Sequence, residues 1–340
     1  MTAMSSATDR SAHVDPGRPL LTVEDLSVTF GRRGEESFKA VDRVSFTVRP
    51  GQTVGLVGES GCGKSVTSLA IMGLLPKRGN SVTGRVDFEG TDLLALNDGE
   101  MRDRRGKDIA MVFQDPLSSL NPVISVGRQV TEVLERHRGM TRKAAMPVAA
   151  DLLTRVGIPD PNQRVKDFPH QMSGGMRQRA LIAIALACAP RLLIADEPTT
   201  ALDVTIQAQI LALLKELVVD TGTALIMITH DLGVVAGLCD EVNVLYGGRI
   251  VERGARHPIF RQPRHPYTNG LLDSIPRLDA VGERLNPIPG SVADNLPWDH
   301  ACAFAPRCSQ PIAICTQTTP ELVQEGDRAL RCHNPVEESR

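Results

Sequence analysis

Eight consecutive residues near position 60 are typical of a phosphate-binding loop. The sequence G-x-x-x-x-G-K-[ST] is matched at every position by Gly58, Glu59, Ser60, Gly61, Cys62, Gly63, Lys64 and Ser65. Glycines let the backbone curl so that its N–H groups face phosphate oxygens, and the lysine places a charge on the outer phosphates. The Ser65 hydroxyl is suited to bind Mg²⁺. The stretch therefore predicts binding of a magnesium nucleoside triphosphate.

Two carboxylates and a histidine follow other aliphatic runs. Asp196 and Glu197 end the run that begins at Arg191, and His230 directly follows residues 224–229. If these runs are parallel strands, their carboxyl ends lie at the sheet edge that carries the phosphate loop. Asp196 is suited to hold Mg²⁺ through water, and Glu197 is suited to polarise an attacking water. These residues predict a nucleotide hydrolase.

Other polar residues near predicted strand and helix ends have a simple alternative role. Gln114 ends a short apolar run and, taken alone, would be an ordinary surface amide. The run Ser173-Gly174-Gly175 opens a predicted helix, where it could bind an anion or only cap the helix. Asp203 precedes an amphipathic helix and fits an N-cap. Phe30 closes an early β-rich run, either as a core aromatic or to stack on a base.

The elements around these residues predict an α/β protein. The phosphate loop lies between an apolar strand at 52–57 and a helix at 66–72, and two further strands, 20–30 and 41–48, precede it. Apolar residues at spacings of three and four predict mostly helix over 117–170, inserted between two strands of the core. A hairpin at 242–251 closes the sheet.

Composition narrows the function further. The 340 residues are 41% hydrophobic, which allows a large core, and their net charge of −2 gives no general attraction to nucleic acid. Only 3% are aromatic, too few for a base-stacking platform. No apolar run approaches the roughly 18 residues of a membrane span. Residues 1–19 are polar and lack the apolar core of a signal peptide, so we expect a disordered tail on a cytoplasmic protein.

Taken together, these motifs resemble the ATP-binding cassette of ABC transporters over residues 20–254. The resemblance implies a P-loop NTPase fold: a mixed sheet core with an antiparallel β part and a helical subdomain at about 116–188. It also implies that ATP lies between two cassettes, so that a second ATPase subunit completes each site. The implied roles are adenine stacking by Phe30, Mg²⁺ and partner sensing by Gln114, a signature motif at Ser173-Gly174-Gly175, Walker B and general base at Asp196 and Glu197, a D-loop at Ala201-Leu202-Asp203, and a switch histidine at His230.

Two departures point to a subgroup of that family. The usual signature LSGGQ has Met172 and Met176 here in place of its leucine and glutamine, a variant that resembles dipeptide and oligopeptide importers. Independently, the run His265-Pro266-Tyr267-Thr268 resembles a stretch found in peptide and nickel importer ATPases. The resemblance implies a peripheral subunit on the cytoplasmic side of the cell membrane. Its partners would be two membrane permease subunits and, indirectly, an extracytoplasmic solute-binding protein, with no nucleic acid.

A proline-rich C-terminal extension, residues 255–340, is expected to have little regular structure. It holds Cys302, Cys308, Cys315 and Cys332, and thiols this dense in a reducing cytoplasm are more often metal ligands than disulfides. Their spacing does not match a CxxC zinc pattern, and it resembles the four-cysteine iron–sulfur site of this importer subgroup. That resemblance implies a [4Fe–4S] cluster, while Zn²⁺ or unliganded thiols stay open.

Several alternatives also stay open. The transported solute could be a dipeptide, an oligopeptide or nickel, and the second cassette could be a copy of this chain or a related one. A non-transport ABC ATPase acting on DNA or ribosomes usually has tandem cassettes, a long coiled coil or a basic arm, and none is visible. A small-molecule kinase built on the phosphate loop would leave Ser173-Gly174-Gly175 and His230 unexplained.

Overall fold

The computed structural model describes residues 18–31, 37–200, 202–274, 288–292 and 300–337. Residues 1–17 of the predicted tail and Ala201 of the predicted D-loop lie outside these ranges. Within them, no helix is long and apolar enough to cross a bilayer.

A four-stranded antiparallel sheet forms the first layer, in the order β2-β1-β4-β5. Its strands are β1 (Leu21–Phe30), β2 (Phe38–Val48), β4 (Asn80–Phe88) and β5 (Thr91–Asp92). The sequence predicts β1 and β2 but not β4, whose alternation is interrupted by Gly84. That glycine has φ 102° and lies beside the shift in register between β1 and β4, where an added Cβ would be 2.6 Å from the Asp25 carbonyl oxygen.

The central sheet has eight strands in the order β11-β12-β10-β9-β3-β8-β7-β6, and its five strands from β9 to β6 are parallel. These are β3 (Thr53–Val57), β6 (Ile109–Val112), β7 (Leu192–Asp196), β8 (Ala224–Thr229) and β9 (Glu241–Tyr246), with β10 (Arg249–Ala255) returning antiparallel beside β9. Every residue of β3, β7 and β8 is buried, because helices cover one face of the parallel strands, and α1 (Lys64–Ile71) and the antiparallel sheet cover the other. The carboxyl ends of these strands lie at one edge.

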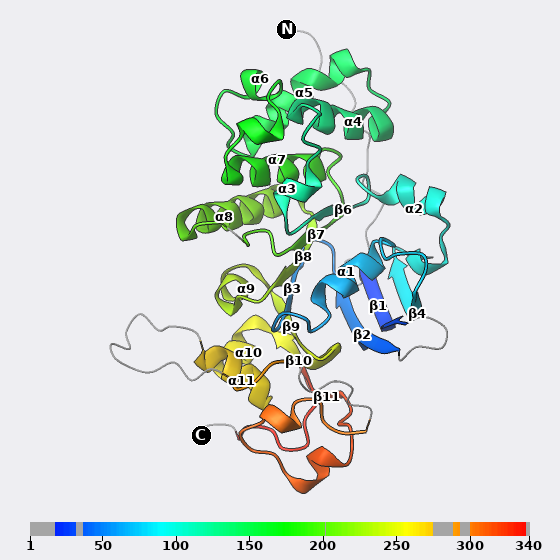
Figure 1. Cartoon of the computed structure of the whole chain (residues 1–340), viewed down its shortest axis with the longest axis vertical. Helices are drawn as coiled ribbons and strands as arrows, with labels where there is room; N and C mark the ends of the chain where they lie inside the picture. The colour runs from blue at the N-terminus through cyan, green and yellow to red at the C-terminus, as the bar shows by residue number, and fades with distance from the viewer. Residues whose placement is uncertain (1–17, 32–36, 201, 275–287, 293–299, 338–340) are drawn as a thin grey trace.

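Helices flank the sheet and gather at one end of the molecule. In Figure 1 the green helices at the top form a group distant from the C-terminal segment at the bottom. This group comprises α3 (Pro116–Ser119), α4 (Val126–Arg138), α5 (Arg142–Arg155), α6 (Pro161–Arg164) and α7 (Gly174–Leu186). Beside the strands lie α1 (Lys64–Ile71), α2 (Asp98–Arg104), α8 (Val204–Thr221) and α9 (Leu232–Leu238). Mostly helical structure over 117–170 is thus confirmed.

The C-terminal extension is more regular than its proline content suggested. It contains α10 (Arg256–Arg261), α11 (Pro266–Asp273), β11 (Val323–Glu325) and β12 (Arg328–Leu330), and β12 pairs with β10. The prediction of little regular structure was therefore wrong for these segments. Pro258 and Pro266 lie in the first turns of α10 and α11, where a helix does not need their missing N–H groups.

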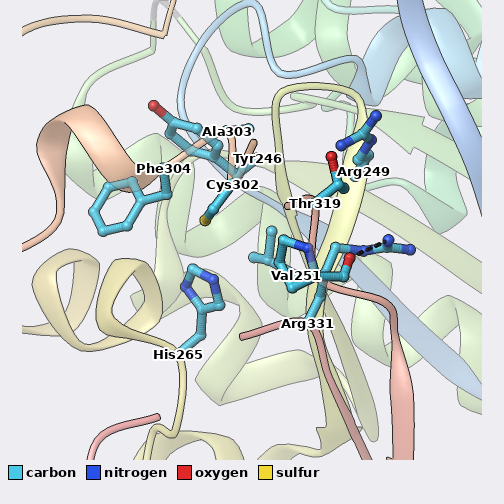
Figure 2. A pocket seen from close by; sticks show the side chains of 10 residues that line it. Tyr246, Arg249, Val251, His265, Cys302, Ala303, Phe304, Thr319 and Arg331 are labelled. Atoms are coloured by element: carbon cyan, nitrogen blue, oxygen red, sulfur yellow. Dashed lines mark hydrogen bonds between the residues drawn. The ribbon is translucent and has the colours of Figure 1, made fainter. Parts of the chain in front are cut away.

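An aromatic cluster packs the extension against the end of β9. The rings of Tyr246 and Tyr267 lie 4.7 Å apart between centroids, and Phe304 contacts both, at 5.1 and 5.3 Å. All three side chains are buried. Figure 2 shows Tyr246, Phe304 and His265 around a small pocket that Cys302 also lines. The extension is thereby joined to the nucleotide-binding core by a shared apolar contact.

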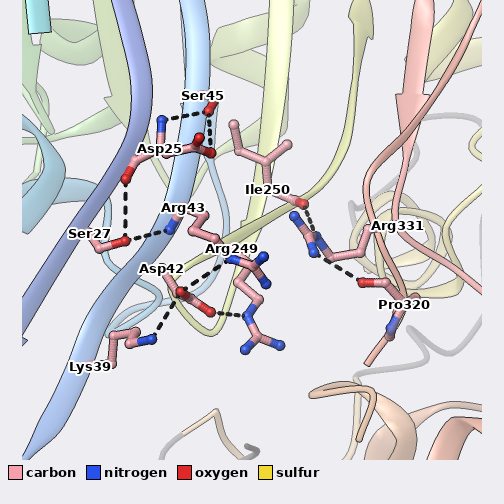
Figure 3. A network of polar contacts seen from close by, with 10 residues as sticks. All are labelled: Asp25, Ser27, Lys39, Asp42, Arg43, Ser45, Arg249, Ile250, Pro320 and Arg331. Carbon is pink, nitrogen blue, oxygen red and sulfur yellow. Dashed lines mark hydrogen bonds and ion pairs between the residues drawn. The ribbon is translucent and has the colours of Figure 1, made fainter. Parts of the chain in front are cut away.

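Polar contacts join β2, β10 and the C-terminal segment, as Figure 3 shows. Arg249 Nε donates to Asp42 Oδ2 at 2.6 Å, and Lys39 Nζ donates to the other carboxylate oxygen at 3.2 Å. Arg331 donates to the carbonyl oxygens of Ile250 and Pro320, each at 3.0 Å. These contacts fix the antiparallel sheet and the extension to the same strand.

Candidate nucleotide site

The phosphate loop lies between β3 and α1, and its shape requires glycine. Gly63 caps α1 with φ 100°, and a Cβ there would lie 2.6 Å from the Ala40 carbonyl oxygen. A Cβ on Gly58 would lie 2.2 Å from the carbonyl oxygen of Leu245. Since a side chain at either position would collide with backbone, the loop is a bare-backbone cradle of the kind that accepts phosphate oxygens.

Lys64 and Ser65 both make hydrogen bonds at the phosphate loop. The Lys64 side chain is buried, and its Nζ donates to the carbonyl oxygens of Gly58 at 2.7 Å and Glu59 at 3.0 Å. The Ser65 Oγ donates to Asp196 Oδ1 at 3.0 Å, which brings the end of β7 to the phosphate loop. Burial raises the pKa of the Asp196 carboxyl group. A hydroxyl and a carboxylate side by side form a hard-oxygen set that fits Mg²⁺.

Glu197 is held by three side chains from the loops that follow β6, β7 and β8. It accepts from Gln114 Nε2 at 3.1 Å and from Thr200 Oγ1 at 2.8 Å, and its Oε1 lies 3.2 Å from His230 Nδ1. Burial raises the pKa of Glu197, but the bonds with Thr200 and His230 outweigh this and hold it below its usual value. The backbone of Glu197 has φ 45°, a strained conformation for a residue with a side chain. A carboxylate so oriented and ionised is suited to act as a base.

The structure thus gathers Lys64, Ser65, Asp196, Glu197 and His230 at one sheet edge, together with the exposed Gln114. Sequence reasoning missed Thr200. A threonine three residues after a glutamate carries no signal of its own, and only the turn after β7 brings the two side chains together.

Two other candidates have the simpler role as well. Asp203 caps α8, its Oδ1 accepting from the Ile206 N–H at 3.0 Å. Phe30, at the end of β1, is half-buried and packs against the core beneath the antiparallel sheet. Both observations fit a structural role. They are also compatible with adenine stacking by Phe30 and a D-loop role for Asp203.

The signature residues lie with the helical group rather than at the phosphate loop. Ser173 caps α7, with its Oγ accepting from the Met176 N–H at 3.3 Å, and Gly174 and Gly175 form the first turn. In the described parts of the chain, no hydrogen bond joins these residues to the phosphate loop. Figure 1 shows α7 well separated from α1.

None of the seven cysteines, all of which lie in the described ranges, forms a disulfide, and four of them share a pocket in the extension. Cys302, Cys308, Cys315 and Cys332 line it together with His265. Burial raises the pKa of three of these thiols, that of Cys332 to about 12. The described residues include no group of three or more His, Cys, Asp or Glu that could hold a metal ion. Cys62, Cys188 and Cys239 are buried outside this pocket.

The phosphate loop, the acidic end of β7 and the helical insertion define a P-loop NTPase of the ATP-binding-cassette type. The ABC transporter family model matches residues 41–200, and the model for the C-terminal region of oligopeptide and dipeptide transporters matches 251–315. The dimeric ATP-binding cassette MJ0796 bound to ADP and Pi superimposes with a TM-score of 0.62 at 28% identity, over 69% of this chain and 98% of that one.

Two similar proteins indicate which ABC proteins this chain is related to. The dipeptide transport ATP-binding protein DppD of Bacillus subtilis is 51% identical over 92% of this chain and 94% of its own length. The oligopeptide transport ATP-binding protein OppD of Salmonella typhimurium is 47% identical over 98% and 99%. The chain belongs to the ATP-binding proteins of ABC peptide transporters. This membership sets aside the small-molecule kinase and the ABC ATPase without a transport role.

Proposed function

We propose that this chain is the ATP-hydrolysing subunit of an ABC importer for dipeptides or oligopeptides. The observation that carries the proposal is Glu197, fixed by Gln114, Thr200 and His230 beside the bond between Ser65 and Asp196. The solute is inferred from the relatives, which transport dipeptides or oligopeptides by name. The names of these relatives favour a peptide over nickel as the transported solute.

The residues divide the chemistry among them. The loop N–H groups and Lys64 bind the outer phosphates of ATP, and Glu197 orients a water in line with the terminal phosphorus. Mg²⁺, held by Ser65, Gln114 and through water by Asp196, would neutralise charge on the phosphates. His230 keeps Glu197 oriented, and Phe30 stacks on adenine.

A second cassette would complete the site. Ser173, Gly174 and Gly175 at the start of α7 would face the γ-phosphate held by the partner, with the D-loop around Asp203 at the same interface. The dimer described for MJ0796 supports this arrangement. Opening and closing of the dimer would drive two permease subunits from the cytoplasmic face of the membrane, with a solute-binding protein outside. In this scheme residues 20–254 are the cassette, 116–188 its helical subdomain and 255–340 the extension.

The four-cysteine pocket would hold a [4Fe–4S] cluster. The support is that Cys302, Cys308, Cys315 and Cys332 line one pocket of the extension. A tetrahedral zinc ion with Zn–S bonds of about 2.3 Å needs its cysteine sulfurs about 3.8 Å apart. A [4Fe–4S] cluster binds each thiolate through a different iron, so its cysteine sulfurs lie farther apart. Anaerobically purified protein should be brown, with iron and sulfide in equal amounts. Colourless protein with stoichiometric zinc would refute the cluster.

Peptide uptake tests the transport proposal. Cells that lack the gene should regain uptake of a radiolabelled dipeptide or short oligopeptide when the chain is restored, but not when Lys64→Ala is. Lys77→Ala, which removes an exposed lysine, is the matched control and should restore uptake. Uptake of nickel instead of peptide under the same conditions would overturn the choice of solute.

A further inference from the structure

One residue of the phosphate loop is bound by the C-terminal extension. Glu59 is the second residue of the loop, and Arg307 lies 248 positions later. The guanidinium group of Arg307 binds the Glu59 carboxylate through its two terminal nitrogens. Nη1 donates to Oε2 at 2.5 Å, and Nη2 donates to Oε1 at 2.9 Å. This two-bond geometry fixes direction as well as charge, because both groups are planar.

Arg307 is buried and anchored on its other side. Its side chain is only 3% exposed, while that of Glu59 is 29% exposed. Its Nε donates to the carbonyl oxygen of Pro289 at 2.7 Å, and Nη2 also donates to that of Gly290 at 3.1 Å. An arginine held in this way cannot follow the carboxylate if the loop moves, so it acts as a fixed point for Glu59.

Tyr267 provides a second contact from the extension to the same residue. The backbone N–H of Glu59 donates to the Tyr267 hydroxyl at 2.8 Å. Tyr267 is fully buried, and its ring is packed by Tyr246 and Phe304. Both the side chain and the backbone of Glu59 are thus set by residues outside the cassette core.

The negative charge of Glu59 links its contact with Arg307 to nucleotide binding. An unpaired carboxylate within a phosphate loop repels the phosphates, because like charges a few ångströms apart in a poorly solvated site destabilise each other. Arg307 pairs with the Glu59 carboxylate and so offsets its charge. Lys64 depends on the same backbone, since its Nζ donates to the carbonyl oxygen of Glu59.

Arg307 also lies in the segment between two cysteines of the pocket, Cys302 and Cys308. It ends the short 3-10 helix Ala305–Arg307, which lies between Cys302 and Cys308. The Cys308 N–H donates to the Ala305 carbonyl oxygen, and the Ala305 N–H donates to that of Cys302. The position of Arg307 is therefore tied to the segment that carries two of the four thiols.

We infer that Arg307 and Tyr267 are positioning residues for ATP binding, which act through Glu59: Arg307 neutralises its carboxylate and Tyr267 orients its backbone. The inference rests on the proposed function, because it assumes that the loop binds ATP. It assigns to the extension a direct part in forming the nucleotide site.

Calorimetric titration of Mg-ATP into the full-length protein tests this. All variants carry Glu197→Gln so that ATP is not consumed. Arg307→Gln should weaken ATP binding on the order of tenfold, since it leaves the Glu59 charge unpaired beside the phosphates. The double variant Glu59→Gln/Arg307→Gln should regain most of that affinity, because the repulsion is gone. A purely structural arginine would leave the double variant as weak as the single one, and that result would overturn the inference.

Two further variants keep the test decisive. Tyr267→Phe removes one oxygen and should weaken ATP binding a few-fold even if Arg307→Gln does not fold. Arg331→Gln removes another buried arginine of the extension, whose side chain donates to the carbonyl oxygens of Ile250 and Pro320 rather than to the phosphate loop, and should leave the affinity unchanged. If the Glu197→Gln parent fails to bind ATP, the proposed function is wrong. If the parent binds ATP and both Arg307→Gln and Tyr267→Phe bind equally well, only this inference is wrong.

Discussion

The Nδ1 atom of His230 lies 3.2 Å from Oε1 of Glu197, at the adjoining ends of β8 and β7. The histidine side chain is 60% exposed, whereas that of the glutamate is 11% exposed. His230 thus joins a nearly buried base to the surface of the cassette. Anything that displaces His230 would alter both the direction and the ionisation of Glu197.

Replacing His230 with alanine should lower ATP turnover about 10²-fold, the scale expected when a catalytic base loses its orientation. The bond from His230 lowers the pKa of Glu197, so its loss should raise that pKa. The remaining activity of His230→Ala should therefore fall off at a higher pH than that of the wild type, which a pH–rate profile measures. His257→Ala, an exposed histidine on α10, is the control. If the activity of His230→Ala falls at the same acidic pH as that of the wild type, His230 does not lower the pKa of Glu197.

Asp42→Asn should destabilise the fold in a pH-dependent way. Burial raises the pKa of Asp42, but Arg249 and Lys39 outweigh it and keep the pKa below the usual 3.8. Because the folded state has the lower pKa, the ionised carboxylate stabilises the fold above pH 3.8, and this stabilisation is lost as pH falls through the folded value.

Denaturant unfolding should thus show a cost of about 3 kcal/mol for Asp42→Asn at pH 7, as for one partner removed from a buried ion pair. That difference should shrink as pH falls below about 4. Asp103→Asn, from an exposed pair with Arg136, should change little. If Asp42→Asn lowers the free energy of unfolding equally at pH 7 and pH 3, the ionised Asp42 carboxylate does not stabilise the fold.

Cys302→Ser should remove most of the iron from anaerobically purified protein, because a hydroxyl replaces one thiolate of the proposed cluster. Cys188→Ala, at a buried cysteine outside the pocket, should retain the iron of the wild type. Iron and acid-labile sulfide assays measure both. Equal iron content in the two variants would exclude Cys302 as a ligand.

Much of the nucleotide site could be predicted from the sequence, because a local motif and strand ends determine it. Lys64 and Ser65 are fixed by the turn from β3 to α1, and Asp196, Glu197 and His230 follow strands whose apolar runs are unmistakable. Parallel pairing then brings these strand ends to one edge.

Other features depend on contacts between distant parts of the chain. The bond from Arg307 to Glu59 spans 248 positions, and neither residue type marks the other. The proline-rich sequence does not predict α10 and α11, because proline usually breaks a helix, although Pro266 stands at a first-turn position where helices accept it. Strand β4 was missed because Gly84 and neighbouring polar residues conceal its alternation.

The central claim is that Glu197 orients the water that attacks an ATP held by the phosphate loop. The most direct measurement compares ATP affinity and single-turnover hydrolysis for wild type and Glu197→Gln. We expect unchanged affinity and hydrolysis at least ~10²-fold slower, because the amide cannot accept the proton of the attacking water. Hydrolysis at the wild-type rate by Glu197→Gln would contradict the account.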